Sequence, residues 1–74
     1  MDNTIHIITS ELMRAHPEYR AGQAYSNAAE QVDPVWMRQN VLADPTTLKP
    51  GPVPNPFYLD ANLPAFLIKW HEGH

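Results

Sequence analysis

The strongest helical signal in the chain is PEYRAGQAYSNAAEQV, residues 17–32. Its apolar residues recur at the spacing i, i+3, i+4 and i+7, which is typical of one buried helical face. These residues are Tyr25, Ala28, Ala29 and Val32. Pro17 is predicted as the first helical residue, since a proline there loses no hydrogen bond, and Glu18 would favour the helix dipole. Gly22 weakens a helix interior by ~1 kcal/mol relative to alanine, so we expect another backbone to pass close to it.

A helix is also predicted before this stretch, capped by Asn3 or Thr4 and running through Ala15. Its apolar face would hold Ile5, Ile8, Leu12 and Met13. The competing interpretation is a short strand over residues 5–8, because isoleucine is β-branched. A lone strand would have no partner, so the helix is favoured. His16 precedes a proline, which disfavours helical geometry and ends this helix.

A third, short helix is predicted after the sequence Asp33-Pro34. Aspartate is a strong N-cap, and proline suits the first helical position. We expect this helix to run to Val41 or Leu42 and to end at the Asp-Pro pair of residues 44–45.

The segment 43–58 is rich in proline and is predicted to be an extended strap. Within residues 46–56, prolines stand at the alternate positions 50, 52, 54 and 56. Because alternate amides of an extended chain point to the same side, this pattern removes the hydrogen-bond donors along one edge, so the segment is not a central strand. We expect a stiff strap whose Val53, Phe57 and Tyr58 lie across the helices.

A closing helix is predicted over residues 60–72, with Asp60 or Asn62 as its N-cap and Gly73 as its stop. Leu63, Phe66, Leu67 and Trp70 would share its buried face. The chain is thus predicted to be one small all-α domain, 1–74, of three to four short helices: a helical region over residues 1–42, the proline-rich strap 43–58 across the bundle, and the closing helix. We expect the core to contain Ile8, Leu12, Tyr25, Ala28, Val32, Trp36, Phe57, Phe66, Leu67 and Trp70.

Charge and cysteine content narrow the classes of partner. Five Lys and Arg face eight Asp and Glu, which gives a formal charge of −3. The cations are dispersed, whereas nucleic-acid binders usually carry a basic stripe, so direct binding to nucleic acid or to anionic membranes is not expected. The chain has no cysteine, no basic apolar leader and no membrane-length apolar run, and we therefore expect a cytoplasmic protein.

No pattern of catalytic or cofactor-binding residues is present in the sequence. It contains no Gly-x-Ser-x-Gly, phosphate loop or dinucleotide fingerprint, so we expect neither an enzyme nor a cofactor. His71 and His74 suggest a metal pair, but Gly73 is expected to break the helix between them, and no metal site is predicted. Gln23 and Asn27 are expected to tie the helix over residues 17–32 to the strap.

The order of polar and aromatic residues resembles that of a group of small proteins from phages, prophages and bacterial genomes. The resemblance rests on Arg20-x-Gly22-Gln23-x-x-x-Asn27, Asn55-Pro56-Phe57-Tyr58-x-Asp60, Pro64-x-Phe66 and Trp70. Members commonly have Asp-Pro before the aromatic pair, where this chain has Asn55-Pro56. The resemblance implies a helical fold and a mobile-element context, and it carries over no catalytic residue.

We expect a non-enzymatic protein that binds and modulates a larger protein, for example an inhibitor of a host or defence protein acting in the host cytoplasm. Its contact surface is predicted to include Arg38, Val53 and Tyr58. The alternative is a small structural or assembly protein that self-associates as a homo-oligomer. The third class is an activity that depends on nucleic acid or on a metal. The missing basic patch argues against the nucleic-acid-dependent activity.

Overall fold

The structure is a computed structural model that describes residues 3–41 and 51–74. Within these residues the chain forms helices and no strand, which confirms the all-α prediction and excludes the strand considered for residues 5–8. The elements are α1 (Thr4–Ala15), α2 (Ala21–Val32), α3 (Pro34–Asn40), the short 3₁₀ helix η1 (Asp60–Asn62) and α4 (Leu63–Gly73). The predicted stop at residues 44–45 and the strap residues 43–50 lie outside the described residues.

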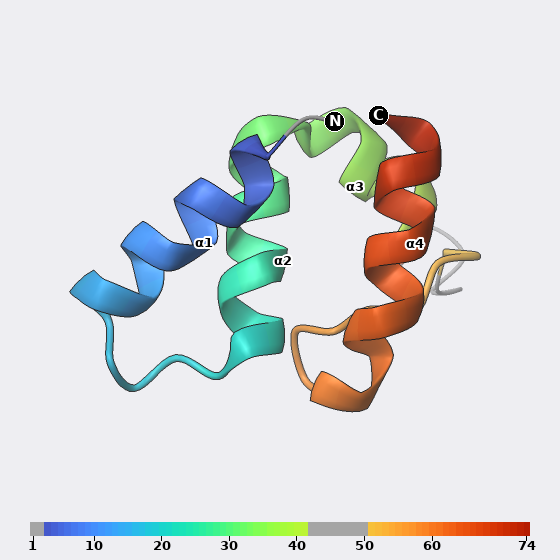
Figure 1. The fold of residues 1–74 in the computed structure, drawn as a ribbon. Helices are drawn as coiled ribbons and strands as arrows, with labels where there is room; N and C mark the ends of the chain where they lie inside the picture. The colour runs from blue at the N-terminus through green and yellow to red at the C-terminus, as the bar shows by residue number, and fades with distance from the viewer. Residues whose placement is uncertain (1–2, 42–50) are drawn as a thin grey trace.

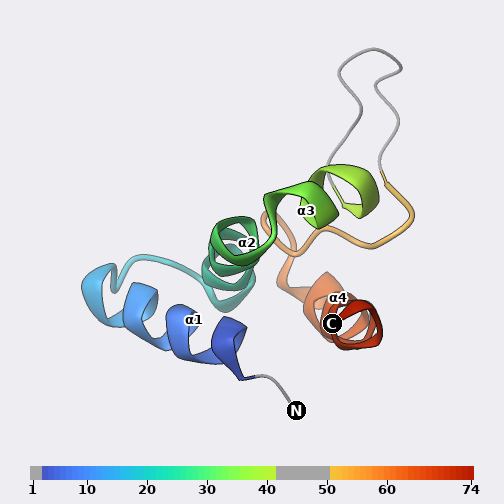
Figure 2. The same ribbon diagram turned by 90° about the horizontal axis from the view of Figure 1, so that it is seen from above.

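Helix α2 occupies the middle of the fold. In two perpendicular views, α1 lies on one side of α2 and α4 lies on the other (Figures 1 and 2). Helix α3 follows α2 after a single residue, Asp33, and the segment 51–59 leads from the α3 side of the molecule back to η1 and α4. No helix among the described residues combines the length and apolar character that a membrane span requires.

The core forms where side chains of all four helices and of the segment 51–59 meet. Its buried members are Ile5, Ala28, Ala29, Met37, Val41, Val53, Phe66 and Trp70. Of the predicted core residues, Ala28, Phe66 and Trp70 are buried, while Ile8, Leu12, Tyr25, Val32, Trp36 and Leu67 are partly buried against the cluster. Phe57, also predicted in the core, is half-buried.

Four aromatic rings fix the position of α4 against α3. Trp36 meets Trp70 edge-to-face with ring centroids 5.0 Å apart, and it meets Phe66 edge-to-face at 6.0 Å. His74 stacks on Trp70 with centroids 3.8 Å apart. Such edge-to-face and stacked pairs stabilise beyond the area that they bury. The closing helix is therefore anchored by the apolar face that the sequence predicts for it.

The start of α2 differs from the prediction. Residues 16–19 form a turn in which the Tyr19 N–H donates to the His16 carbonyl oxygen at 3.0 Å. Proline is favoured at the second position of such a turn, and Pro17 takes that place instead of the first helical position. Arg20 is then extended, with φ −78° and ψ 160°, and α2 begins at Ala21.

The helix caps confirm one prediction and correct others. The Asp33 side chain accepts a hydrogen bond from the Trp36 N–H at 2.9 Å, as expected for an N-cap. Asn3 and Asn62 occupy N-cap positions, but neither side chain makes a capping hydrogen bond. Asp60 begins η1 and does not cap α4. Gly73 is the last residue of α4, so the helix runs through it and is not broken before His74.

Candidate functional site

Residues 55–60, which we call the strap corner, are held against α2 by Arg20. Its guanidinium donates to the Phe57 carbonyl oxygen at 2.8 Å, to the Tyr58 carbonyl oxygen at 3.3 Å and to the Asp60 carboxylate at 3.4 Å. Arginine suits this position because its planar donors diverge toward several acceptors at once. The contacts fix the backbone of the strap corner on both sides of Tyr58.

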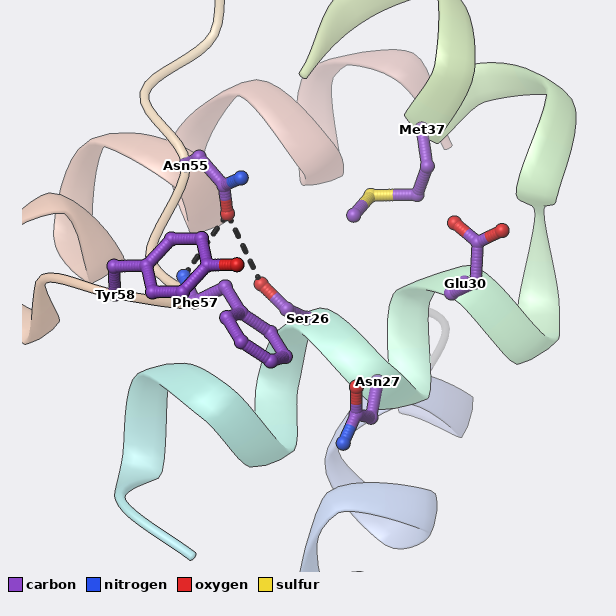
Figure 3. Close-up of a pocket in the computed structure, with 7 residues that line it drawn as sticks. All are labelled: Ser26, Asn27, Glu30, Met37, Asn55, Phe57 and Tyr58. Carbon is purple, nitrogen blue, oxygen red and sulfur yellow. Dashed lines mark hydrogen bonds between the residues drawn. The ribbon is translucent and has the colours of Figure 1, made fainter. Parts of the chain in front are cut away.

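Asn55 holds the strap corner from within. Its side-chain oxygen accepts from the Phe57 N–H at 2.9 Å and from the Ser26 hydroxyl at 3.4 Å (Figure 3). Its backbone carbonyl accepts from the Asn62 side chain at 2.9 Å. An asparagine oxygen that accepts from the amide two residues on forms an Asx turn, which is a common way to fix a tight bend. Asn55 therefore joins α2, the strap corner and η1.

The strap corner also supplies a cap for α2. The Asp60 carboxylate accepts a hydrogen bond from the Gly22 N–H at 3.1 Å. Gly22 lies in the first turn of α2, where backbone N–H groups have no partner within the helix and an anion is favoured. The capping hydrogen bond of α2 therefore comes from a side chain nearly forty positions away in sequence, and the N-cap residue Arg20 makes none with its side chain.

The prediction of a close backbone approach at Gly22 is confirmed. A Cβ atom at this position would lie 2.2 Å from the Pro56 carbonyl oxygen and 2.6 Å from the Asp60 carboxylate. Both separations are shorter than any van der Waals contact allows. The small residue is therefore what lets the strap corner lie directly on α2.

Beside the strap corner lies a hollow of about 270 Å³. Its walls come from α2, α3 and the strap corner (Figure 3). The lining residues are Ser26, Asn27, Glu30, Met37, Asn55, Phe57 and Tyr58. Met37 and Phe57 make it apolar, while the two asparagine amides and the Glu30 carboxylate place polar groups around it. The volume suits one or two side chains of a partner better than a large cofactor.

The two residues at the tip of the strap corner are exposed although they are largely apolar. Tyr58 is 79% exposed and Leu59 is 56% exposed. The Tyr58 ring meets the Phe57 ring edge-to-face with centroids 4.7 Å apart. An exposed aromatic side chain on a backbone held this firmly loses little freedom when a partner covers it.

The sequence-predicted contact residues do not come together in one place. Tyr58 lies at the exposed tip, as expected. Val53 is only 6% exposed and belongs to the core, and its backbone N–H donates to the Asn40 carbonyl oxygen at 2.8 Å. It is therefore removed from the candidate surface. Arg38 is exposed in the last turn of α3 and is not one of the residues that line the hollow.

The expected tie between the strap and the pair Gln23 and Asn27 is not observed within residues 3–41 and 51–74. Arg20, Gly22 and Ser26 make the hydrogen bonds to the strap corner instead. Asn27 is one of the residues that line the hollow. Arg20 and Asn55 hold the strap corner through contacts with residues far away in sequence, and local patterns did not predict this role for them.

His71 and His74 point to different neighbours. His71 lies beside His6 of α1, with their Nε2 atoms 3.2 Å apart. His74 lies with Nε2 2.9 Å from an Asp33 carboxylate oxygen and Nδ1 2.8 Å from the Trp70 carbonyl oxygen. The Asp33 carboxylate oxygen and the Trp70 carbonyl oxygen are both hydrogen-bond acceptors. Within the described residues there is no group of three or more His, Cys, Asp or Glu that could hold a metal ion.

Two hydrogen bonds lower the pKa of Asp33. The larger effect comes from the Trp36 backbone N–H, and the second comes from the His74 side chain. A carboxylate whose folded-state pKa is lowered adds stability above its unfolded pKa of about 4 and loses it as the pH falls through the folded value. Asp33 is therefore a source of acid sensitivity at the junction of α2, α3 and α4.

We expect the Asp33→Asn variant to be less sensitive to acid than the natural protein. Asparagine keeps an oxygen for the Trp36 N–H but removes the titrating charge and the ion pair with His74. The midpoint of thermal unfolding, followed by circular dichroism, should fall more steeply below about pH 4 for the natural protein than for the variant. Parallel curves for the two proteins would contradict this assignment.

Comparison of the chain with protein-family models, with curated proteins and with solved structures gave no match.

Proposed function

We propose that the protein is a non-enzymatic binding module whose strap corner docks onto a larger protein. The observation that carries the proposal is the exposure of Tyr58 on a backbone fixed by Arg20, Asn55 and the cap at Gly22. Tyrosine and arginine are enriched among the residues that dominate binding energy, and such anchors usually sit beside pockets. The hollow next to Tyr58 supplies such a pocket for a side chain of the partner.

The chemistry of the hollow supports binding over catalysis. Ser26 is its only hydroxyl side chain besides Tyr58 among the lining residues, and its hydroxyl donates to the Asn55 amide oxygen. An amide oxygen is not basic enough to activate a serine as a nucleophile. Glu30 is the one carboxylate of the lining, whereas many hydrolytic mechanisms need a pair of carboxylates.

The proposal includes the compartment in which the protein acts, the cytoplasm of the host cell. A small extracellular domain usually depends on disulfides, and this chain has no cysteine, which supports a cytoplasmic role. The resemblance to small phage and prophage proteins supports a partner in the host cytoplasm. Inhibition of a host or defence protein is the form of modulation that we propose.

Tyr58→Ala is expected to weaken partner binding about tenfold or more while leaving stability nearly unchanged. The tagged natural protein and the variant would be used to capture partners from a bacterial lysate, and the affinity of the recovered partner would then be measured with purified components. Val35→Ala is the matched control, because Val35 is 53% exposed on α3 and is not one of the residues that line the hollow. An equal loss of affinity for the partner in both variants, or no loss of affinity in Tyr58→Ala, would count against the proposed surface.

Self-association is the second candidate function. Ile7 on α1 and Ile68 on α4 are 58% and 61% exposed, so apolar surface remains outside the strap corner. Light scattering of the purified protein separates the two functions. A stable homo-oligomer whose mass is unaffected by Tyr58→Ala, with no partner retained, would favour the assembly function.

A further inference from the structure

A second cluster of side chains lies outside the strap corner and links three helices. His6 of α1, Tyr25 of α2 and His71 of α4 make it up. His6 Nδ1 lies 2.7 Å from the Tyr25 hydroxyl, and His6 Nε2 lies 3.2 Å from His71 Nε2. All three residues are half-buried, so water reaches the cluster. The two histidines are 65 positions apart in the sequence.

A hydrogen bond between the two facing nitrogens requires that one of them carry a hydrogen and the other a lone pair. If both Nε2 atoms carried hydrogens, the hydrogens would point at each other, and if neither did, two lone pairs would face one another. One shared proton resolves this conflict as a hydrogen bond, and a bound cation resolves it equally well. We propose that His6 and His71 form a two-nitrogen binding site for a divalent transition-metal ion of the Zn²⁺ type.

The spacing of the nitrogens fits this occupant. Two imidazole nitrogens bound at 2.0–2.1 Å in tetrahedral geometry are roughly 3.3 Å apart. The observed separation between His6 Nε2 and His71 Nε2 is 3.2 Å. The separation of the two nitrogens therefore already matches that of a metal-bound pair. The two rings are nearly parallel, at 19°, with centroids 5.3 Å apart.

Tyr25 supplies the support that metal-binding histidines usually have. A ligating histidine normally donates its second ring N–H to an acceptor, which fixes its tautomer and orientation. In the tautomer whose His6 Nδ1–H donates to the Tyr25 hydroxyl oxygen, the Nε2 lone pair of His6 is left for the metal. Tyr25 is therefore a positioning residue in this site and not a ligand.

The ligand types indicate which ions bind and how firmly. Neutral imidazole suits zinc, copper and nickel, and the chain has no cysteine to compete for them. Since the described residues offer no third His, Cys, Asp or Glu to complete a group, water fills the remaining positions and the ion exchanges readily. The site differs from the pair His71 and His74 suggested by the sequence, because His74 is bound to Asp33. The bound ion would clamp α1 to α4.

Titration calorimetry with Zn²⁺ tests the proposal on the 74-residue chain. We expect saturable binding of about one ion per chain, and a loss of affinity of about tenfold or more in His6→Gln and in His71→Gln. Glutamine keeps a hydrogen-bonding side chain but removes the imidazole ligand. His16→Gln is the matched control, because the contacts of His16 are with Tyr19 and Glu18 and not with the cluster. The affinity of this variant for Zn²⁺ should equal that of the natural protein. Tyr25→Phe should weaken binding by about tenfold with both ligands intact.

A second measurement covers the case in which a variant does not fold. In the natural protein, Zn²⁺ should shift the imidazole ¹⁵N signals of His6 and His71 together and leave those of His16 in place. Absence of saturable binding, or equal binding by all variants, would overturn the proposal and leave the pair as a hydrogen bond only. The outcome does not depend on the strap corner, since none of the substituted residues belongs to it.

Discussion

Phe66→Ala is expected to destabilise the protein by about 3–5 kcal/mol. Phe66 is fully buried, with 0% of its surface exposed, and its ring contacts Trp36 edge-to-face and lies beside Trp70. Removal of the ring leaves a cavity at the junction of α3 and α4, and the neighbouring rings cannot close it without losing their own contacts. A domain of 74 residues has a reserve of only a few kcal/mol, so we expect most of the variant to be unfolded.

Urea unfolding followed by circular dichroism measures this effect. Ile68→Ala on the same helix is the matched control, because Ile68 is 61% exposed and its truncation should change the free energy of unfolding by about 0.5 kcal/mol or less. An unchanged midpoint for Phe66→Ala would show that α4 does not close the core as described.

Gly22→Ala is expected to destabilise the protein by roughly 3 kcal/mol, although alanine is the better helix former. Intrinsic propensity alone would favour alanine by about 1 kcal/mol. The added methyl group, however, would lie 2.2 Å from the Pro56 carbonyl oxygen, so the strap corner would have to move away from α2. Overpacking costs about 1–3 kcal/mol, and the movement also weakens the hydrogen bond from Gly22 to Asp60.

Whether Gly22→Ala lowers or raises the free energy of unfolding shows which cause is larger, the overpacking by the added methyl group or the helix propensity of alanine. Gln23→Ala is the control on the neighbouring position, where alanine should be neutral or slightly stabilising. Thermal unfolding of both variants, with the intrinsic fluorescence of Trp36 and Trp70 as a second readout, gives the comparison. If Gly22→Ala were more stable than the natural protein, the close approach of the strap corner to α2 would be disproved.

Local patterns in the sequence were sufficient to predict that α2, α3 and α4 exist, and they also predicted where α3 begins. The four-residue apolar repeat in residues 17–32 predicts α2, and Asp33-Pro34 predicts the start of α3 together with its cap. Both signals act within one or two turns of chain, where hydrogen bonds and side-chain spacing are set by neighbours in sequence. For the same reason, the buried face of α4 with Phe66 and Trp70 was predicted correctly.

The start of α2 could not be predicted from its neighbours. Pro17 and Glu18 satisfy the local rules for a helix start, but Arg20 is held extended by its contacts with Phe57 and Tyr58. The cap comes from Asp60, a residue that local rules assign to α4. Contacts between residues this far apart outweigh the propensities of the two or three residues at a helix end.

The candidate site was predicted only in part. Tyr58 was expected at the surface and lies there, whereas Val53 was expected beside it and is buried. Local spacing could not show this, since the contacts of Val53 are with residues of other elements in the core cluster and its N–H donates to the Asn40 carbonyl oxygen. Glu30 and Met37 line the hollow because α3 folds back beside α2 after Asp33, which no local spacing predicts.

The sequence by itself determined that this protein is a small all-helical domain, and it also indicated a tight approach at Gly22. These features depend on periodicity, capping residues and side-chain size, all of which can be read over a few positions. Only the tertiary structure decided that Asp60 caps α2, that Arg20 fixes the strap corner and that His6 meets His71. Each of these contacts joins residues that are far apart in the chain, and their distances depend on how whole helices pack.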